Sequence, residues 1–230
     1  MRTVGVLGGM GPEATILFMQ RLVAATPARD DRDHIPLLVD QNTQVPSRIA
    51  ALIEGGGDDP APVLAAMAAR LEAAGAQALA MPCNTAHHYA DAIRAAASVP
   101  FLSMVDLSVA ALADAYSGAV VGVLASPAVA ITGLYDGPLR RAGLTPLHPE
   151  DQPAMLAAIR ALKVSADDPA AQAAACDAAR ALVADGAQAL LIACSEFSLI
   201  RDAIADVAPA LDSLDVLVAA TADFSRTGPG

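Results

Sequence analysis

The stretch GAQAL at Gly75–Leu79 decides the fold, because the same five letters return 111 residues later at Gly186–Leu190. Extended forward, the same offset places Cys83 of GAQALAMPCNT on Cys194 of GAQALLIACSE. In each copy, a glycine suited to end a helix precedes a short apolar run, and the cysteine comes just after that run. We therefore expect two similar halves, each with a cysteine past the carboxyl end of a buried strand.

The rest of the chain supports this duplication. VGVL at Val4–Leu7 recurs at Val121–Leu124, and Pro100 near the end of the first copy corresponds to Pro209 in the second. Short apolar runs alternate with Ala- and Leu-rich helical patterns, which is typical of βαβ units and parallel sheets. The predicted strands are Val4–Leu7, Pro36–Asp40, Ala78–Met81, Pro100–Ser103, Ala119–Leu124, Leu144–His148, Ala189–Ala193 and Ala210–Asp212. Predicted helices include Glu13–Ala25, Ala61–Ala74 and Ala170–Ala184.

These patterns predict an α/β fold of two pseudo-symmetric Rossmann-like domains, each with a small, mostly parallel sheet flanked by helices. We expect one half to comprise residues 1–103 plus 213–230 and to carry Cys83. The other half, residues 104–212, carries Cys194. Open α/β sheets bind ligands at the carboxyl ends of their strands, so we expect an active site in a cleft between the two halves.

Composition narrows the class of protein. A net charge of −11 and a pI of about 4.5 make a nucleic-acid partner a poor fit. The chain lacks an apolar run of the roughly eighteen residues that span a membrane, and its first residues lack the pattern of a signal peptide. We therefore expect a cytoplasmic protein without membrane partners. Three cysteines favour free thiols over disulfides, and Cys176 lies on an amphipathic helical pattern, which suggests a packing role.

The glycine-rich segment LGGMGPEAT, Leu7–Thr15, raises a competing hypothesis. Gly9–Ala14 fits the G-x-G-x-x-A form of the dinucleotide fingerprint, with Asp40 as a candidate ribose ligand. However, Asp40 follows at a distance of roughly thirty residues, longer than the usual ~20. The corresponding stretch of the second half, GVLASPAVAIT, lacks the glycines. We interpret the loop as a ligand rim, with glycines that let the backbone approach the ligand and with Met10 near its tip.

Two equivalent cysteines allow three kinds of chemistry. A disulfide switch is one, although redox pairs usually have the C-x-x-C spacing. A metal site formed by Cys83, His87, His88 and Cys194 is another, but the spacing fits no zinc signature. The third is proton transfer, in which one thiol removes a proton from a carbon acid and the other protonates its opposite face. A helix start after each cysteine would lower the thiol pKa.

The segments GGMGPEAT, MPCNTAHH and ACSEFSLI resemble signature segments of the aspartate/glutamate racemase superfamily, in its aspartate racemase branch. The resemblance covers nearly the whole chain. It implies a racemase that acts without pyridoxal phosphate or another cofactor, with Cys83 and Cys194 as its two catalytic bases. The implied substrate is a small dicarboxylate amino acid, first aspartate and then glutamate, and the implied assembly is a homodimer.

The resemblance also implies which residues bind the substrate. The α-carboxylate would be held beside the cysteines, and the side-chain carboxylate by an arginine and by the only lysine of the chain. An arginine fork suits a carboxylate, and an acidic protein needs such local cations to hold a dianion. Two positions depart from the family pattern, with serine for threonine after the second cysteine and Thr43 for the usual proline. The predicted substrate-binding residues are Met10, Asn42, Arg48, Asn84, Thr85, Lys163 and Ser195.

Two further residues are predicted to support the thiols. His87 lies four positions after Cys83, where it could tune the thiol or simply pack. Glu196 lies two positions after Cys194 and could orient or deprotonate it, or stabilise a helix start. Other activities of the superfamily, such as hydantoin racemase, maleate isomerase or malonate decarboxylase, remain alternatives, as do a nucleotide-binding protein and a binding protein without catalysis.

Overall fold

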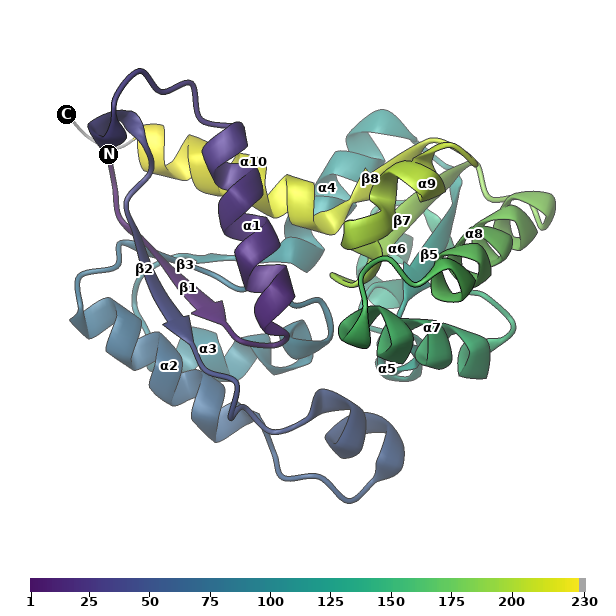
Figure 1. Cartoon of the computed structure of the whole chain (residues 1–230), viewed down its shortest axis with the longest axis horizontal. Helices are drawn as coiled ribbons and strands as arrows, with labels where there is room; N and C mark the ends of the chain where they lie inside the picture. The colour runs from purple at the N-terminus through teal and green to yellow at the C-terminus, as the bar shows by residue number, and fades with distance from the viewer. Residues whose placement is uncertain (228–230) are drawn as a thin grey trace. The chain divides into compact units, whose positions relative to one another are not determined.

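The computed structural model describes residues 1–227. The chain forms two compact units: unit 1 comprises Met1–Met104 and the chain from Leu214 onward, and unit 2 comprises Val105–Ser213. Each unit contains one four-stranded parallel sheet flanked by helices (Figure 1). The predicted α/β fold with two domains is confirmed. Within the described residues, none of the helices is both long enough and apolar enough to cross a membrane.

The two sheets have the same strand order, β2-β1-β3-β4 in unit 1 and β6-β5-β7-β8 in unit 2, with all neighbours parallel. Each predicted strand is present, and each end lies within one residue of its predicted position. The bounds are β1 Val4–Gly8, β2 Leu37–Gln41, β3 Ala78–Ala80, β4 Phe101–Leu102, β5 Val120–Ala125, β6 Thr145–Leu147, β7 Ala189–Ala193 and β8 Ala210–Asp212.

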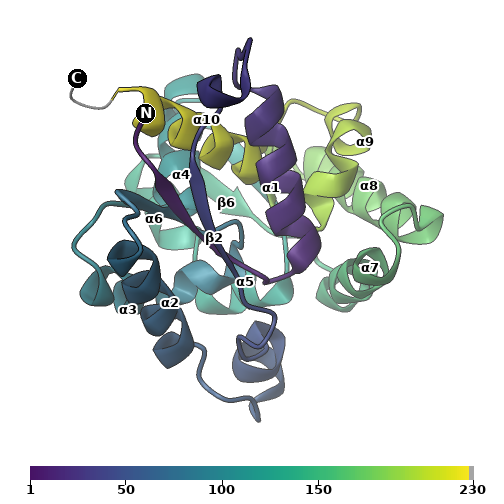
Figure 2. The same ribbon diagram turned by 60° about the vertical axis from the view of Figure 1, so that its left-hand side comes forward.

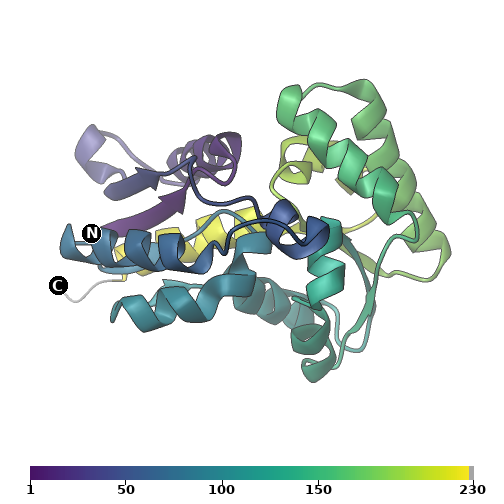
Figure 3. The same cartoon turned by 90° about the horizontal axis from the view of Figure 1, so that it is seen from below.

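Helices cover both faces of the sheet in unit 1. They are α1 Pro12–Ala24, α2 Ala61–Ala73, α3 Ala90–Ala96 and α10 Ser213–Arg226, with short turns of helix at Asp31–Asp33, Ala50–Glu54 and Thr85–Tyr89. α2 and α3 pack together on the face opposite α1 (Figure 3). α10 runs beside α1 (Figure 2), and the Arg21 guanidinium on α1 is 2.9 Å from the Asp215 carboxylate on α10.

Unit 2 is built in the same way. Its helices are α4 Met104–Ala115, α5 Pro127–Thr132, α6 Asp136–Arg141, α7 Gln152–Val164, α8 Pro169–Ala184 and α9 Arg201–Ala205, with a turn of 3-10 helix at Phe197–Ile200. Leu190, Ile192 and Cys194 join the apolar cluster under α7, α8 and α9. Leu191 and Ala193 join the cluster on the other face. The period of two in β7 therefore directs Cys194 toward the α7 and α8 side.

Strand order also fixes where a ligand can approach each unit. The chain leaves β1 for β2 on one side and later returns to β3 on the other, so the connections diverge between β1 and β3. β5 and β7 have the same relation in unit 2. Such a switch point opens a crevice at the carboxyl ends of the two strands. Cys83 and Cys194 follow β3 and β7 at these ends.

The structure changes the interpretation of the glycine-rich loop. Gly9 has φ +91°, and a Cβ at this position would lie 2.4 Å from the carbonyl carbon of Asn42. The Gly9 amide donates to the Thr15 hydroxyl at 3.0 Å. Gly9 therefore makes room for the protein's own backbone, which corrects the interpretation that it makes room for a ligand. The candidate ribose ligand Asp40 is ion-paired to Arg70 at 2.6 Å, so the dinucleotide hypothesis loses both of its anchors.

Replacing Gly9 by alanine should destabilise unit 1, because positive φ alone costs a non-glycine residue about 1–3 kcal/mol and the Asn42 backbone must also shift. The free energy of unfolding, measured with urea, checks this. Gly56→Ala is the matched control, because its Cβ would meet nothing within 4 Å. Equal stabilities of the two variants would contradict the steric role of Gly9.

Candidate functional site

Cys83 lies in a buried environment just after β3. The residue is 6% exposed, and it packs in the apolar cluster that includes Met10, Val45 and Ala86. Leu79 and Met81 belong to the same cluster, so alternation along the strand carries Cys83 to the α2 side of the sheet. Met10, which the sequence placed near the tip of a ligand rim, is a buried member of the same apolar cluster as Cys83.

Asn84 and Thr85 start the short 3-10 helix that follows Cys83. Asn84 is buried at the N-terminal end of this helix, and Thr85 is partly exposed as its first residue. Asn42 directly follows β2, and its side-chain oxygen accepts a hydrogen bond from the Gln44 amide at 3.0 Å. These three predicted binding residues therefore lie on segments that leave the carboxyl ends of β2 and β3, the two strands that flank β1.

Arg48 has a hydrogen-bonding group available for an anion. Its Nη1 donates to the carbonyl oxygens of Pro46 at 3.0 Å and Val45 at 3.4 Å. Its Nε is buried and has no hydrogen-bond partner among the residues that the structure describes. An unsatisfied buried donor costs free energy, and a carboxylate that binds a guanidinium through two parallel bonds would satisfy it.

Tyr89 was not singled out by the sequence, yet it lies within electrostatic reach of Arg48. Burial raises the pKa of the Tyr89 phenol, the Asp59 carboxylate raises it further, and the Arg48 guanidinium lowers it. Tyr89 is the last residue of the 3-10 helix that begins beside Cys83, so the charge of Arg48 is felt at the end of that helix. In the sequence, only the short distance between Tyr89 and Cys83 could have pointed to Tyr89 as a residue near the site.

Cys194 occupies the equivalent position in unit 2 and has polar partners. Its thiol donates to Glu196 Oε2 at 3.0 Å, and the Ser195 hydroxyl donates to the same oxygen at 3.4 Å. The other oxygen, Oε1, is 3.5 Å from the Lys163 ammonium. Lys163 is in the last turn of α7, the helix that covers the Cys194 side of the sheet. The structure thus joins Lys163, Glu196 and Cys194 in one chain of contacts, of which the sequence suggested the link between Glu196 and Cys194 but not the link to Lys163.

The pKa of Cys194 is raised well above its ordinary value, which corrects the expectation of a lowered thiol pKa at this position. Burial is the largest cause, followed by the negative charge of Glu196 and the hydrogen bond to its carboxylate. The amides of Glu196 and Phe197 do lower the pKa, as a helix start would, but they are outweighed. Cys194 is therefore a protonated thiol, and it donates its hydrogen to Glu196.

His87 is buried with both ring nitrogens engaged. Nδ1 is 2.8 Å from the Cys83 carbonyl oxygen, and Nε2 is 3.0 Å from the Met104 amide nitrogen. A carbonyl only accepts and an amide only donates, so Nδ1 carries the proton and the ring is neutral. His87 therefore contacts the backbone of Cys83, and neither nitrogen has a lone pair left for a metal. His88, by contrast, is exposed.

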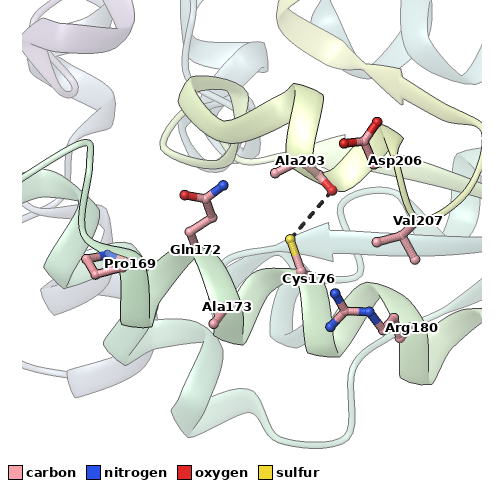
Figure 4. Close-up of a pocket in the computed structure, with 8 residues that line it drawn as sticks. All are labelled: Pro169, Gln172, Ala173, Cys176, Arg180, Ala203, Asp206 and Val207. Carbon is pink, nitrogen blue, oxygen red and sulfur yellow. Dashed lines mark hydrogen bonds between the residues drawn. The ribbon is translucent and has the colours of Figure 1, made fainter.

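The third cysteine belongs to a separate surface groove. Cys176 on α8 donates to the Ala203 carbonyl at 3.6 Å, and Figure 4 shows it at the floor of a groove between α8 and α9. Burial raises the pKa of the Cys176 thiol. The groove is lined by none of the predicted site residues, which agrees with a packing role for Cys176.

Comparisons with known proteins agree on one family. The profile of the Asp/Glu/Hydantoin racemase family matches residues 7–221. A broad specificity amino-acid racemase, RacX of Bacillus subtilis (strain 168), is 26% identical over 232 residues, 95% of this chain and 96% of its own. The Picrophilus torridus aspartate racemase structure has a TM-score of 0.88 and 29% identity, covering 98% of this chain and 94% of that one. An aspartate racemase homologue from Pyrococcus horikoshii OT3 shares the fold, with TM-score 0.75, 17% identity, and coverage of 98% and 99%.

Replacing Glu196 by glutamine should lower the pKa of Cys194, because it removes a negative charge and a carboxylate acceptor that both favour the protonated thiol. Iodoacetamide alkylation of the Cys194 peptide, followed by mass spectrometry as a function of pH, should then show a midpoint at lower pH. Glu13→Gln, on α1 of unit 1, is the control. An unchanged or higher midpoint would contradict the assigned cause.

Proposed function

Because the chain belongs to the Asp/Glu/Hydantoin racemase family, in its aspartate racemase branch, we propose that it interconverts L- and D-aspartate. Membership makes it an isomerase, a racemase of the type that does not require pyridoxal phosphate. The family resemblance inferred from the three sequence segments is thereby confirmed. The substrate, the two-cysteine mechanism and the residue roles are the proposal.

One observation carries this proposal. Two buried cysteines follow the equivalent strands, β3 and β7, of two sheets with the same strand order. Racemisation needs a base on one face of Cα and an acid on the other, and a duplicated scaffold can supply the same group twice. We therefore assign Cys83 to one half-reaction, in the domain of residues 1–103 plus 213–230, and Cys194 to the other, in residues 104–212. The reaction requires both sulfur atoms to reach the same Cα.

In each direction, one thiolate takes the Cα proton and the opposite thiol delivers a proton to the other face. The hydrogen bond from Cys194 to Glu196 supports the acid form of Cys194. When Cys194 must act as the base, its thiol proton has an acceptor already in contact, the Glu196 carboxylate. Glu196 thus supports Cys194 in both directions, and His87 holds the backbone of Cys83.

The two carboxylates of the substrate need cationic or amide partners. The buried, unpartnered Nε–H of Arg48 supports its role as the ligand of one carboxylate. Lys163 is already paired with Glu196, so a second carboxylate would share its ammonium. We assign Asn84, Thr85 and Ser195 to the α-carboxylate, since they directly follow the cysteines, and Asn42 and Met10 to the wall of the unit 1 crevice. A homodimer, implied by the resemblance, remains part of this proposal.

A second candidate is a racemase with a wider substrate range. The similarity to the Bacillus subtilis broad specificity amino-acid racemase extends over 95% of the chain and favours this possibility. Glutamate and neutral amino acids therefore belong in the same assay as aspartate.

Incubation with L-aspartate in deuterated water should yield D-aspartate with deuterium at Cα, observable by NMR and chiral chromatography. Cys83→Ala and Cys194→Ala should each lower kcat by about 10²-fold or more, because each removes one of two proton-transfer groups. Cys176→Ala should retain activity, since its thiol lies in a separate groove. Racemisation by either of the first two variants at the wild-type rate would refute the mechanism.

Arg48→Met and Lys163→Met should each raise KM for aspartate by about tenfold, because a hydrogen bond to a charged group contributes about 1.5–3 kcal/mol. Steady-state kinetics with aspartate and alanine measure this, and the variant that has lost the side-chain carboxylate ligand should discriminate less between the two. Arg32→Met, whose side chain is 85% exposed, is the control. If KM stays at the control value, the residue does not bind a carboxylate.

A further inference from the structure

Each candidate catalytic cysteine has a partner four residues later that holds its backbone. In unit 1 this partner is His87, whose Nδ1–H donates to the Cys83 carbonyl at 2.8 Å. In unit 2 it is Ser198, whose amide donates to the Cys194 carbonyl at 3.1 Å and whose hydroxyl oxygen lies 3.4 Å from the same carbonyl oxygen. The offset of 111 residues that relates the cysteines also relates His87 to Ser198. The two partners are thus equivalent in position but differ in chemistry.

The side chain of each partner is in turn bound to a strand–helix junction. The His87 Nε2 accepts from the amide of Met104, the first residue of α4. The Ser198 hydroxyl donates to Asp212 Oδ1 at 2.7 Å, where β8 ends. Asp212 and Ser198 are 5% and 1% exposed, so their bond is protected from water. The chain passes between the units at these two junctions.

Fixing the carbonyl of a cysteine fixes the orientation of its peptide and of the Cα–Cβ bond. The sulfur then moves only by rotation about χ1, which has three staggered positions. Proton transfer to or from carbon requires close placement of the sulfur, and a displacement of about 1 Å can cost about 10²-fold in rate. Contacts to the cysteine carbonyl therefore act on the position of Sγ through the backbone.

We infer that His87 and the pair Ser198–Asp212 are positioning residues, each of which aligns the sulfur of the cysteine in its own unit for proton transfer. This inference rests on the proposed two-cysteine chemistry. The arrangement is modular, because His87 acts on Cys83 and Ser198 acts on Cys194.

Because each positioning residue acts on one cysteine, its replacement should affect the two enantiomers differently. A general loss of stability would not produce such a difference. With α-deuterated L- and D-aspartate, each enantiomer reports the transfer to the cysteine that deprotonates it. If Cys83 is misplaced, proton transfer at Cys83 becomes the slowest step. The isotope effect then rises for the enantiomer that Cys83 deprotonates, and it falls for the enantiomer that Cys194 deprotonates. A misplaced Cys194 does the reverse. The assignment of enantiomers to cysteines need not be known.

We expect His87→Phe and Ser198→Ala to lower kcat by about 10- to 100-fold and to shift the two isotope effects in opposite senses. His87→Gln, which keeps one donor and one acceptor, and Asp212→Asn, which keeps an acceptor for Ser198, should recover most of the rate. Phe101→Leu removes the ring whose centroid lies 5.3 Å from that of His87, and Ser225→Ala removes another buried serine bonded to a carbonyl. Both controls should leave the isotope effects unchanged.

Shifts in the same sense, or reduced rates with unchanged isotope effects, would show a merely structural role and overturn the inference. Rates for the conservative variants as low as for His87→Phe and Ser198→Ala would also overturn it. Failure of the proposed function looks different, because the wild-type protein would then fail to racemise aspartate at all.

Discussion

The parallel pairing of β1 with β3, and of β5 with β7, is the constraint on which the rest of the structure depends. A parallel strand has both faces covered by helices, so its side chains are apolar along the whole length. Polar chemistry is then confined to the ends of the strands. The chain connections diverge between these paired strands. This divergence explains why both candidate catalytic cysteines lie just past the ends of β3 and β7. Duplication of the unit repeats the position.

Arg48 in unit 1 and Lys163 in unit 2 are cations held by neighbouring groups of the protein. The chain carries a net charge of −11, so a dianion needs local compensation. The partners are backbone carbonyls for Arg48 and the Glu196 carboxylate for Lys163. Held by such contacts, long cationic side chains lose less freedom when a carboxylate arrives. In the proposed reaction, a substrate carboxylate at Lys163 would compete with Glu196 for the same ammonium group.

Most of the fold could be predicted from the sequence, because buried parallel strands are continuous apolar runs and the repeat reveals each element twice. The cysteine positions followed from the same repeat. The pKa of Cys194 could not be predicted, since it depends on burial and on the rotamer that brings Glu196 into contact. The role of Gly9 required the position of the Asn42 backbone. The contact of Ser198 with Cys194 could not be predicted, because serine and histidine are different residue types. Only the offset of 111 residues relates Ser198 to His87.

Thermodynamics limits the effect that the unequal surroundings of Cys83 and Cys194 can have on the proposed reaction. Mirror-image amino acids have the same free energy in water, so the equilibrium constant of the proposed reaction is one. The ratio of kcat/KM for the two enantiomers must therefore also be one, however different the two thiols are. The neutral His87 beside Cys83 and the Glu196 carboxylate beside Cys194 can only redistribute binding and turnover between the enantiomers. An enzyme with asymmetric halves can thus hold one enantiomer more tightly, but it must turn that enantiomer over more slowly in the same proportion.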